Sequence, residues 1–315
     1  MLGVKVPKEQ GEKARQLLIC KDLLIKTFKI KNDSQFVYFP VKKPIPGYES
    51  VDCEFEQRAP HPPSLQSLGV SSFDLIGDIA VVDIPEELQA RKGEIAGILL
   101  ARNPIHTVVE KTTEVTGQFR VRKHAHILGE EKSQTVHTEY GLHFKLDINR
   151  VYFNPRLATE RMRLAQKVNP GEVIIDMFCG VGPFSVMISK YAQAHTIYAI
   201  DINPDAIWYL RENIRLNACK NVIPIHGDAR EQVPRIGKVD RILMNLPHSA
   251  FEFLPEALQA GDIIHYYCIC ESVEKEKERI GTLAENMGIR VTLQGYQTVK
   301  SYAPRMDMYR IDLHT

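Results

Sequence analysis

The chain has 315 residues, of which 44% are hydrophobic and 25% are charged, and its formal net charge is +1. This composition is typical of a soluble globular protein and argues against a disordered, collagen-like or membrane protein. The near-zero net charge excludes a histone-like polycation, but it leaves open a nucleic-acid partner held at a local basic face. A chain of this length has room for two or three domains of about 100–200 residues each.

The sequence shows no sign of export, of a membrane span or of a metal centre. No apolar run reaches the ~18 residues that a spanning helix needs, and residues 1–8 lack the apolar core of a signal peptide. We therefore expect a cytoplasmic protein without a membrane partner. The six cysteines include no Cys-x-x-Cys pair, so we expect neither a zinc site nor a disulfide framework and assign no metal.

The first 64 residues have the pattern of a small α/β domain. Apolar spacing predicts a helix over residues 8–24, and the aromatic and β-branched run at 36–39 predicts a strand. Residues 57–64 contain three prolines, which is typical of a linker. We therefore place the first domain boundary after residue 64.

Residues 65–160 are predicted to form a mixed α/β domain. The pattern predicts a helix over residues 85–102, which Pro85 opens at its first turn. Strand-like runs begin near Phe73 and include residues 78–83, 107–109, 119–121 and 142–148.

From residue 161 to 315, strands and helices alternate regularly. This alternation predicts a parallel, doubly wound sheet. The expected strands cover residues 173–177, 196–201, 222–226, 241–244 and 263–270. Helices are expected after the first, second, fourth and fifth of these strands, and two long β-rich runs follow.

A glycine-containing turn joins the strand at 173–177 to the next helix. Gly180 and Gly182 let the backbone approach a ligand, and the helix that opens near Pro183 adds a favourable dipole. The dinucleotide fingerprint requires a third glycine where this chain has Ser185, which disfavours a nicotinamide cofactor. A plain tight turn remains the alternative.

Two carboxylates follow later strands of the same predicted sheet. Asp201 lies about 20 residues beyond the glycines, where a carboxylate can accept both hydroxyls of a ribose. Asn203 is expected to cap the helix that Pro204 starts, and Asp201 could merely help in that capping. Asp228 follows the next strand, at the edge where ligands of such folds bind, although it could be only a turn residue.

The order of Asp-x-x-x-Gly-x-Gly, a strand-end Asp, Gly-Asp and Asn-Leu-Pro resembles class I S-adenosylmethionine-dependent methyltransferases. The resemblance implies a Rossmann-like sheet of seven strands ending in an antiparallel hairpin, which residues 289–313 could supply. It places the methionine part of the cofactor near the glycine loop, the ribose at Asp201 and the adenine near Asp228. It assigns these residues to the cofactor: Asp176, Phe178, Gly180, Gly182, Asp201, Ile202, Asp228, Ala229 and Asn245.

A narrower resemblance rests on six ordered segments: FNPRLATER, DMFCGVGPFS, YAIDINP, NLPHSA, HYY and SYAPR. Together they resemble the archaeal and eukaryotic tRNA (guanine-N1)-methyltransferases, which modify the guanosine at position 37, immediately 3′ of the anticodon. The resemblance covers about residues 67–315, and the N-terminal domain is similar to the family's extra tRNA-contacting domain. It implies S-adenosylmethionine as cofactor and the anticodon loop and body of tRNA as partner. We expect a monomer.

Asn245-Leu246-Pro247 takes the place of the Asn-Pro-Pro-Tyr motif of enzymes that methylate planar nitrogens. A rigid turn there aims a side-chain amide and backbone carbonyls at an N–H donor. An ordinary polar turn at the end of a strand is the alternative. Leu246 and His248 depart from the motif and disfavour methylation of an exocyclic amine.

Guanine N1 carries a proton, so its methylation requires a general base at N1 and a donor to O6. The resemblance implies that Glu160 takes the proton and that Arg120 hydrogen-bonds O6. It further implies that Asn245 and Pro247 hold the base in position.

Both charged residues have alternatives. Glu160 could form a surface ion pair with Arg156 or Arg163 at helical spacing. In an alternating strand, Arg120 and Arg122 would share one face, so either could reach the base or hold a phosphate.

A target base inside a stacked loop must be turned out of the stack. Tyr152, Phe153 and Tyr302 are candidates for stacking against it, although each could be a core residue. Two rival functions remain: an aminocarboxypropyl transferase of wyosine biosynthesis and a tRNA-binding protein without activity.

Overall fold

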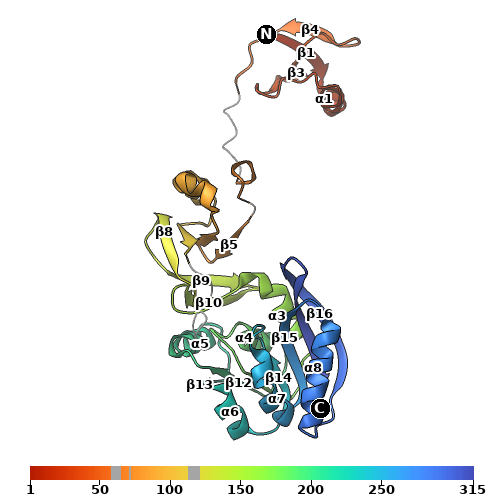
Figure 1. The fold of residues 1–315 in the computed structure, drawn as a ribbon. Coiled ribbons are helices and arrows are strands. Elements are labelled where there is room, and N and C mark those ends of the chain that lie inside the picture. The colour runs from red at the N-terminus through yellow and green to blue at the C-terminus, as the bar shows by residue number, and fades with distance from the viewer. Residues whose placement is uncertain (58–64, 71, 113–120) are drawn as a thin grey trace. The chain divides into compact units, whose positions relative to one another are not determined.

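The computed structural model describes residues 1–57, 65–70, 72–112 and 121–315 (Figure 1). The chain forms two compact units, Met1–Ser64 and Leu65–Thr315. Within the described ranges, no helix is long and apolar enough to cross a membrane. The expected further division at residue 160 stays a prediction.

The N-terminal unit is a small antiparallel sheet with one helix packed on it. The strand order is β2-β3-β1-β4. Its elements are β1 (Leu2–Pro7), α1 (Gly11–Cys20), β2 (Lys31–Asn32), β3 (Phe36–Pro40) and β4 (Glu49–Asp52). Val4 and Val6 of β1 pack against Ala14 and Leu18 of α1 in its core. The predicted helix over 8–24 is therefore shorter than expected, and β1 and β4 were not predicted.

The second unit begins with a sheet in the order β5-β6-β7-β8. Its elements are β5 (Phe73–Ile76), β6 (Ile79–Val82), α2 (Lys92–Leu100), β7 (Thr107–Lys111) and β8 (His124–Gly129). The predicted helix over 85–102 is in fact a 3₁₀ segment, Glu86–Arg91, followed by α2. The strand expected at 119–121 lies largely outside the described residues.

A hairpin of β9 (Gln134–Glu139) and β10 (Leu142–Asp147) follows, and it is fastened to helix α5 (Pro204–Leu216). Asn213 accepts a hydrogen bond from Lys145 N (2.7 Å) and donates to Lys145 O (3.2 Å). Just beyond the helix, Asn217 accepts from His143 N (2.9 Å) and donates to His143 O (2.7 Å). Two asparagine side chains thus bind the outer backbone edge of β10.

The remainder of the unit contains a seven-stranded sheet in the order β13-β12-β11-β14-β15-β17-β16. Its strands lie between residues 173 and 314, and the structure describes every residue of this range. Its strands are β11 (Val173–Asp176), β12 (Thr196–Asp201), β13 (Val222–His226), β14 (Val239–Met244), β15 (Gly261–Cys270), β16 (Thr292–Ala303) and β17 (Met306–His314). β11 to β15 run parallel, and β17 is antiparallel to both β15 and β16. The predicted Rossmann-like sheet and its closing hairpin are confirmed.

Helices cover both faces of this sheet (Figure 1). One face packs against α3 (Ala158–Ala165), α4 (Pro183–Tyr191) and α5, and the other against α6 (Ala229–Ile236), α7 (Leu254–Ala260) and α8 (Val273–Asn286). Successive side chains of β11 point to opposite faces of the sheet, so Ile174 lies in the core on one face and Ile175 in the core on the other. Helix α6 was not predicted, because Pro234 lies inside it and an interior proline ordinarily argues against a helix.

Candidate active site

A cavity of about 380 Å³ lies at the carboxyl ends of the parallel strands, within the size range of small-molecule sites. Consecutive strand ends supply its walls, as expected for a ligand site in an open α/β sheet. The predicted residues that line it are Phe178, Gly180, Asp201, Ile202, Asp228, Ala229, Asn245 and Pro247. The structure therefore brings together most of the residues that the sequence singled out.

The two glycines of the turn have different roles. Both have positive φ, 54° at Gly180 and 84° at Gly182, a conformation that favours glycine. Gly180 lines the cavity, where an added Cβ would meet nothing closer than 3.8 Å. At Gly182 a Cβ would lie 2.3 Å from Leu210 Cδ1. Gly182 thus lets α4 and α5 pack closely and does not line the cavity.

Asp201 holds the glycine turn in place. Its Oδ2 accepts a hydrogen bond from Gly180 N at 2.7 Å, and its Oδ1 accepts from Asn203 N at 2.8 Å. Burial raises the pKa of Asp201, although these hydrogen bonds act in the opposite direction. The side chain of Asn203 accepts from Asp205 N, so the predicted helix cap is confirmed. Asp201 therefore supports the start of α5 and faces the cavity at the same time.

Asp176 is fully enclosed beneath the turn and is not one of the residues that line the cavity. Ser185 Oγ donates a hydrogen bond to its Oδ2 at 2.7 Å. Oδ1 is buried and has no hydrogen-bond partner among the described residues. Burial raises the pKa of Asp176 to about 7, although the hydrogen bond from Ser185 acts against the increase. Ser185, which occupies the position of the third glycine in the dinucleotide fingerprint, thus binds the carboxyl group of Asp176.

Asp228 is both a turn residue and a cavity residue. It caps α6 by accepting a hydrogen bond from Arg230 N at 2.9 Å, and it lines the cavity. The two interpretations of Asp228 therefore do not exclude each other.

The Asn245 side chain reaches the cavity directly after β14. Its Oδ1 is buried and finds no hydrogen-bond partner within the described part of the chain. Pro247 and His248 line the same wall, and the His248 ring packs edge-on against Tyr302, with 5.3 Å between the centroids. An ordinary polar turn would leave the amide in solvent, so this arrangement favours a ligand-binding turn.

Glu160 lies on α3 and is only 3% exposed, so the surface ion pair with Arg156 or Arg163 was a wrong alternative. Arg156 instead binds Asp74, at 2.6 Å. Glu160 Oε1 accepts hydrogen bonds from Tyr267 Oη, at 3.0 Å, and from Arg310 Nη1.

The second oxygen of Glu160, Oε2, is buried without a hydrogen-bond partner in the ranges that the structure describes. Glu160 is not one of the residues lining the cavity, but Leu157, just before α3, is. The structure thus places Glu160 beside the cavity rather than in its wall.

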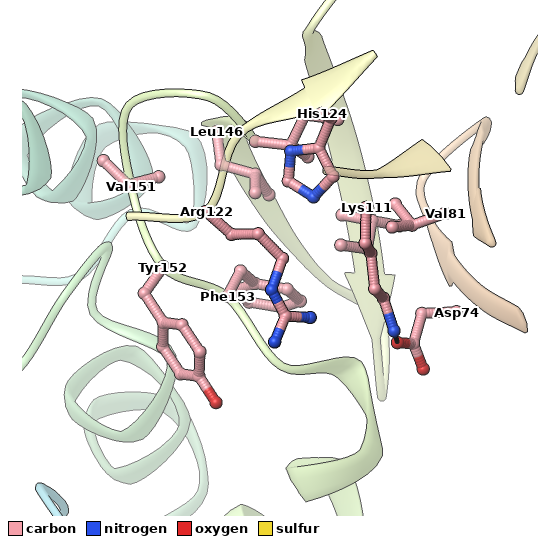
Figure 2. A pocket seen from close by; sticks show the side chains of 11 residues that line it. Asp74, Val81, Lys111, Arg122, His124, Leu146, Val151, Tyr152 and Phe153 are labelled. Atoms are coloured by element: carbon pink, nitrogen blue, oxygen red, sulfur yellow. Dashed lines mark hydrogen bonds and ion pairs between the residues drawn. The ribbon is translucent and has the colours of Figure 1, made fainter. Parts of the chain in front are cut away.

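Arg120 lies outside the described residues. Arg122 lines a second, smaller cavity together with Asp74, Lys111 and His124 (Figure 2). Its guanidinium group extends past Tyr152, which lines both cavities. Tyr152 thus connects the smaller cavity, which contains Arg122, to the larger cavity.

The three aromatic candidates for base stacking differ in their surroundings. Tyr152 is 45% exposed and Tyr302 is 52% exposed, and both line the larger cavity. Phe153 packs against Phe144 and His137 and belongs to the core. Tyr152 and Tyr302 therefore remain the candidates.

Sequence reasoning missed several lining residues, among them Arg230, Glu252, Phe253 and Lys300. An ion pair of 3.2 Å joins Arg230, in the first turn of α6, to Glu252, in the 3₁₀ segment Ala250–Phe253. Lys300 comes from β16, far along the chain. No local pattern relates such positions, so only the folded sheet could reveal them. Among the described residues, no group of His, Cys, Asp and Glu could hold a metal ion.

Residues 135–292 match the profile of the TRM5/TYW2 methyltransferase domain. The chain belongs to this family. Residues 3–49 match the tRNA methyltransferase 5 N-terminal domain, and residues 59–132 match the TYW2 N-terminal domain. The resemblance stated from the sequence motifs is therefore confirmed.

TRM5/TYW2 relatives match along nearly the full chain. The tRNA (guanine(37)-N(1))-methyltransferase Trm5b of Pyrococcus abyssi is 43% identical over 99% of this chain and 98% of its own. Its crystal structure aligns with a TM-score of 0.82 and covers 100% of this chain and 99% of that chain. A structure described as the complex of aTrm5 and tRNALeu aligns with a TM-score of 0.84 at 34% identity, over 100% of this chain and 99% of that chain.

A second branch of the TRM5/TYW2 family matches over a shorter range. The tRNA(Phe) (4-demethylwyosine(37)-C(7)) aminocarboxypropyltransferase of Methanocaldococcus jannaschii is 35% identical. That alignment covers 74% of this chain and 93% of the relative.

Proposed function

We propose that this protein transfers the methyl group of S-adenosylmethionine to N1 of guanosine 37 in tRNA, forming 1-methylguanosine. The observation that carries the proposal is the Asn245–Pro247 turn at the cavity, whose buried amide oxygen has no hydrogen-bond partner among the described residues. It occurs in a chain similar over nearly its whole length to tRNA (guanine(37)-N(1))-methyltransferases. We further propose that the enzyme acts in the cytoplasm as a monomer.

The cavity fits S-adenosylmethionine, which when bound supplies an electrophilic methyl group. Each carboxylate oxygen can accept more than one hydrogen bond. Gly180 N donates to one Asp201 oxygen and Asn203 N to the other, and each oxygen can accept a further hydrogen bond from a ribose hydroxyl. Gly180 lines the cavity next to this carboxylate, and without a side chain it lets a ligand approach the backbone there. We assign the adenine to the wall formed by Asp228 and Ala229, and the methionine part to the region of Phe178 and Asp176.

The guanine base suits the wall formed by Asn245 and Pro247. A buried amide oxygen without a partner costs about 1–3 kcal/mol, a cost that a bound N–H donor removes. Guanine presents such donors at N1 and N2, in the plane of the ring. The fixed φ of Pro247 restricts the turn and so helps to fix the direction of the amide.

Glu160 is the proposed general base. When the methyl group bonds to N1, the N1 proton must leave, and a carboxylate oxygen is a suitable acceptor. Oε2 of Glu160 has no partner within the described residues, whereas Oε1 is engaged. We assign to Arg120 a hydrogen bond to guanine O6, where negative charge develops as the proton leaves.

Replacing Asp201 with alanine is expected to weaken cofactor binding about ten- to hundredfold, because hydrogen bonds to a charged group contribute about 1.5–3 kcal/mol. Isothermal titration with S-adenosylmethionine measures this directly. Asp201→Asn is the matched variant, since it keeps an oxygen acceptor and is expected to lose less affinity. Normal affinity in Asp201→Ala would remove this residue from the ribose site.

The experiment that tests the proposed function uses labelled S-adenosylmethionine and two tRNA transcripts, one with guanosine and one with adenosine at position 37. Nucleoside mass spectrometry then identifies the product. We expect 1-methylguanosine from the first transcript only. An absence of product despite measurable cofactor binding would refute methyl transfer to guanosine 37.

Aminocarboxypropyl transfer is the second candidate, because a relative with that activity is 35% identical over 74% of this chain. That reaction adds a larger group to a modified guanosine. The same mass spectrometry separates the two activities, provided that a wyosine-precursor tRNA is included. The higher identity and wider coverage of the methyltransferases favour methyl transfer.

A further inference from the structure

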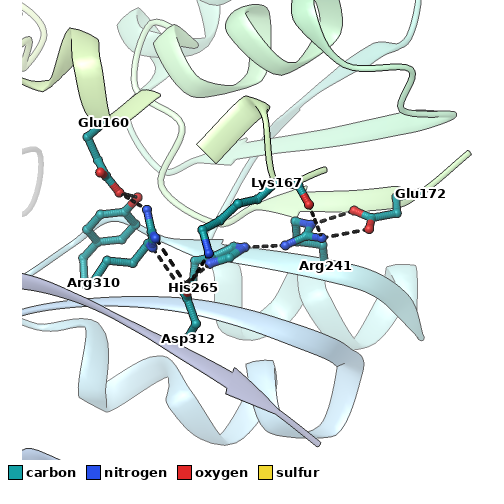
Figure 3. Close-up of polar contacts among 8 residues, drawn as sticks. Glu160, Lys167, Glu172, Arg241, His265, Arg310 and Asp312 are labelled. Carbon is teal, nitrogen blue, oxygen red and sulfur yellow. Dashed lines mark hydrogen bonds and ion pairs between the residues drawn. The ribbon is translucent and has the colours of Figure 1, made fainter. Parts of the chain in front are cut away.

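A row of buried polar and charged side chains crosses one face of the sheet, from Glu172 at one end to Glu160 at the other (Figure 3). The row joins neighbouring strands, with Arg241 on β14, His265 on β15, and Arg310 and Asp312 on β17. His265 lies directly opposite Asp312 in the β15–β17 pairing, and Tyr267 lies opposite Arg310. Because residues two apart on a strand share a face, the pleat aligns these side chains.

Arg310 is the member of the row that contacts Glu160. It is only 3% exposed, and its Nη1 binds Glu160 Oε1. The other side of the same guanidinium binds Asp312, with Nε at 2.8 Å from Oδ1 and Nη2 at 3.4 Å from Oδ2. An arginine is planar and presents its donors in a fixed fork. Anchoring one side on Asp312 therefore fixes where the other side holds Glu160.

Asp312 is itself held from two further directions. His265 Nδ1 lies 2.7 Å from Oδ1, and Lys167 Nζ lies 3.2 Å from Oδ2. Burial acts to raise the pKa of Asp312, but the hydrogen bonds from His265 and Arg310 and the charge of Arg310 outweigh it, so the pKa lies below its ordinary value. Asp312 is thus a permanently charged anchor for Arg310.

The row does not have the composition of a proton relay. Arg241 Nη1 lies 2.5 Å from His265 Nε2, and an arginine only donates, so Nε2 accepts and Nδ1–H donates to Asp312. Burial lowers the pKa of His265 to about 4, outweighing the opposite effect of Asp312, and the ring is neutral near pH 7. Arginines, which do not release protons in proteins, lie on both sides of the His265–Asp312 pair. The row orients groups and does not conduct protons.

We propose that Arg310 is a positioning residue for the methyl transfer proposed above. It holds Oε1 of Glu160, so that Oε2 is left as the oxygen that accepts the N1 proton. The inference rests on the proposed function, because Arg310 acts only through Glu160, the proposed base. It assigns Arg310 no contact with cofactor or RNA. Tyr267 Oη assists by donating to the same oxygen, at 3.0 Å.

Stability alone does not account for this arrangement. A buried ion pair often contributes no more to folding than apolar side chains of similar volume. Arg310 and Glu160 lie 150 positions apart in sequence, and each is almost wholly buried. A positioning role explains why a charged residue occupies this site next to the proposed base.

The test is a double-mutant cycle on single-turnover methyl transfer, with saturating S-adenosylmethionine and guanosine-37 tRNA. Arg310→Lys keeps the charge but loses the fork, and we expect it to slow transfer about tenfold or more, since small misplacements of catalytic groups have large effects. In the Glu160→Gln background the same substitution should have no further effect, because the side chain that Arg310 positions can no longer take the N1 proton. Cofactor affinity, measured by titration, should stay unchanged in all variants.

Arg241→Lys is the matched control. It changes an equally buried arginine of the same row that does not touch Glu160. Transfer should slow less than about threefold, because residues that share no partner couple only weakly. The inference is overturned if Arg310→Lys transfers at the normal rate, if its effect persists in Glu160→Gln, or if Arg241→Lys slows transfer equally. If the unaltered protein forms no 1-methylguanosine, the proposed function is wrong. If the protein is active but the effects of the two substitutions add, only the role of Arg310 is wrong.

Discussion

Glutamine in place of Glu160 is expected to slow methyl transfer by about 10²–10⁴-fold, the usual contribution of a general base. The amide keeps the size of the side chain, and its oxygen can still accept from Tyr267 or Arg310, but it cannot take the N1 proton. Since Glu160 lies beside the cavity and not in its wall, the affinity for S-adenosylmethionine should hardly change. Single-turnover rates and cofactor titration measure the two quantities separately.

Glu172→Gln is a suitable control for this substitution. Glu172 is also buried and also paired with an arginine, Arg241, at 2.6 and 2.8 Å, but it belongs to the far end of the row. Its replacement should lower thermal stability without a comparable loss of rate. Equal losses of turnover and cofactor affinity in Glu160→Gln would contradict the general-base role.

Asparagine in place of Asp176 is expected to stabilise the cofactor-free protein, increasingly so as the pH rises. The pKa of Asp176 is raised to about 7 in the folded state, from an ordinary value of 3.8. Between these two pH values the folded protein retains a proton that the unfolded chain releases, so this group makes the protein less stable as the pH increases. The loss is complete above pH 7 and amounts to about 4 kcal/mol, at 1.36 kcal/mol per pKa unit.

Asparagine does not titrate, so the variant escapes this loss. Urea unfolding of both proteins at pH 4, 5.5 and 8 should show a difference near zero at the lowest pH and the largest gain at the highest. Ser185→Ala serves as the control, because it keeps the carboxyl group and should therefore retain the pH dependence. A stability difference that is the same at every pH would show that Asp176 ionises normally in the folded protein.

Much of the catalytic fold could be predicted from the sequence because its strands are buried on both faces. Val173, Ile174 and Ile175 form a continuous apolar run, and the helices between the strands open with signals such as Asn203 and Pro204. The predictions failed where local chemistry and tertiary structure disagree. Helix α6 was not predicted because Pro234 lies inside it, and strand β1 was not predicted because its run of six residues is too short to show a clear pattern.

The candidate site could be predicted where it consists of strand ends. Asp201, Asp228 and Asn245 follow successive strands, and parallel strands bring their carboxyl ends to one edge. The partners of Glu160 could not be predicted in this way. Arg310 lies near the end of the chain, where polar and apolar residues alternate along β17, and its polar side chain would ordinarily indicate a solvent-facing position. Only the pairing of β17 with β15 reveals that this face is buried beneath α3.

The asparagines that bind β10 also bear on the protein's resistance to aggregation. The outer edge of a hairpin exposes backbone N–H and C=O groups that can recruit a strand from another chain. Asn213 and Asn217 are four residues apart, a helical rise of about 6 Å, which approximates the spacing of about 6.7 Å between alternate residues of a strand. Their amides therefore satisfy the donors and acceptors of His143 and Lys145 that an added strand would use. A helix thus closes a β-edge against intermolecular pairing with two side chains, without contributing any backbone to the sheet.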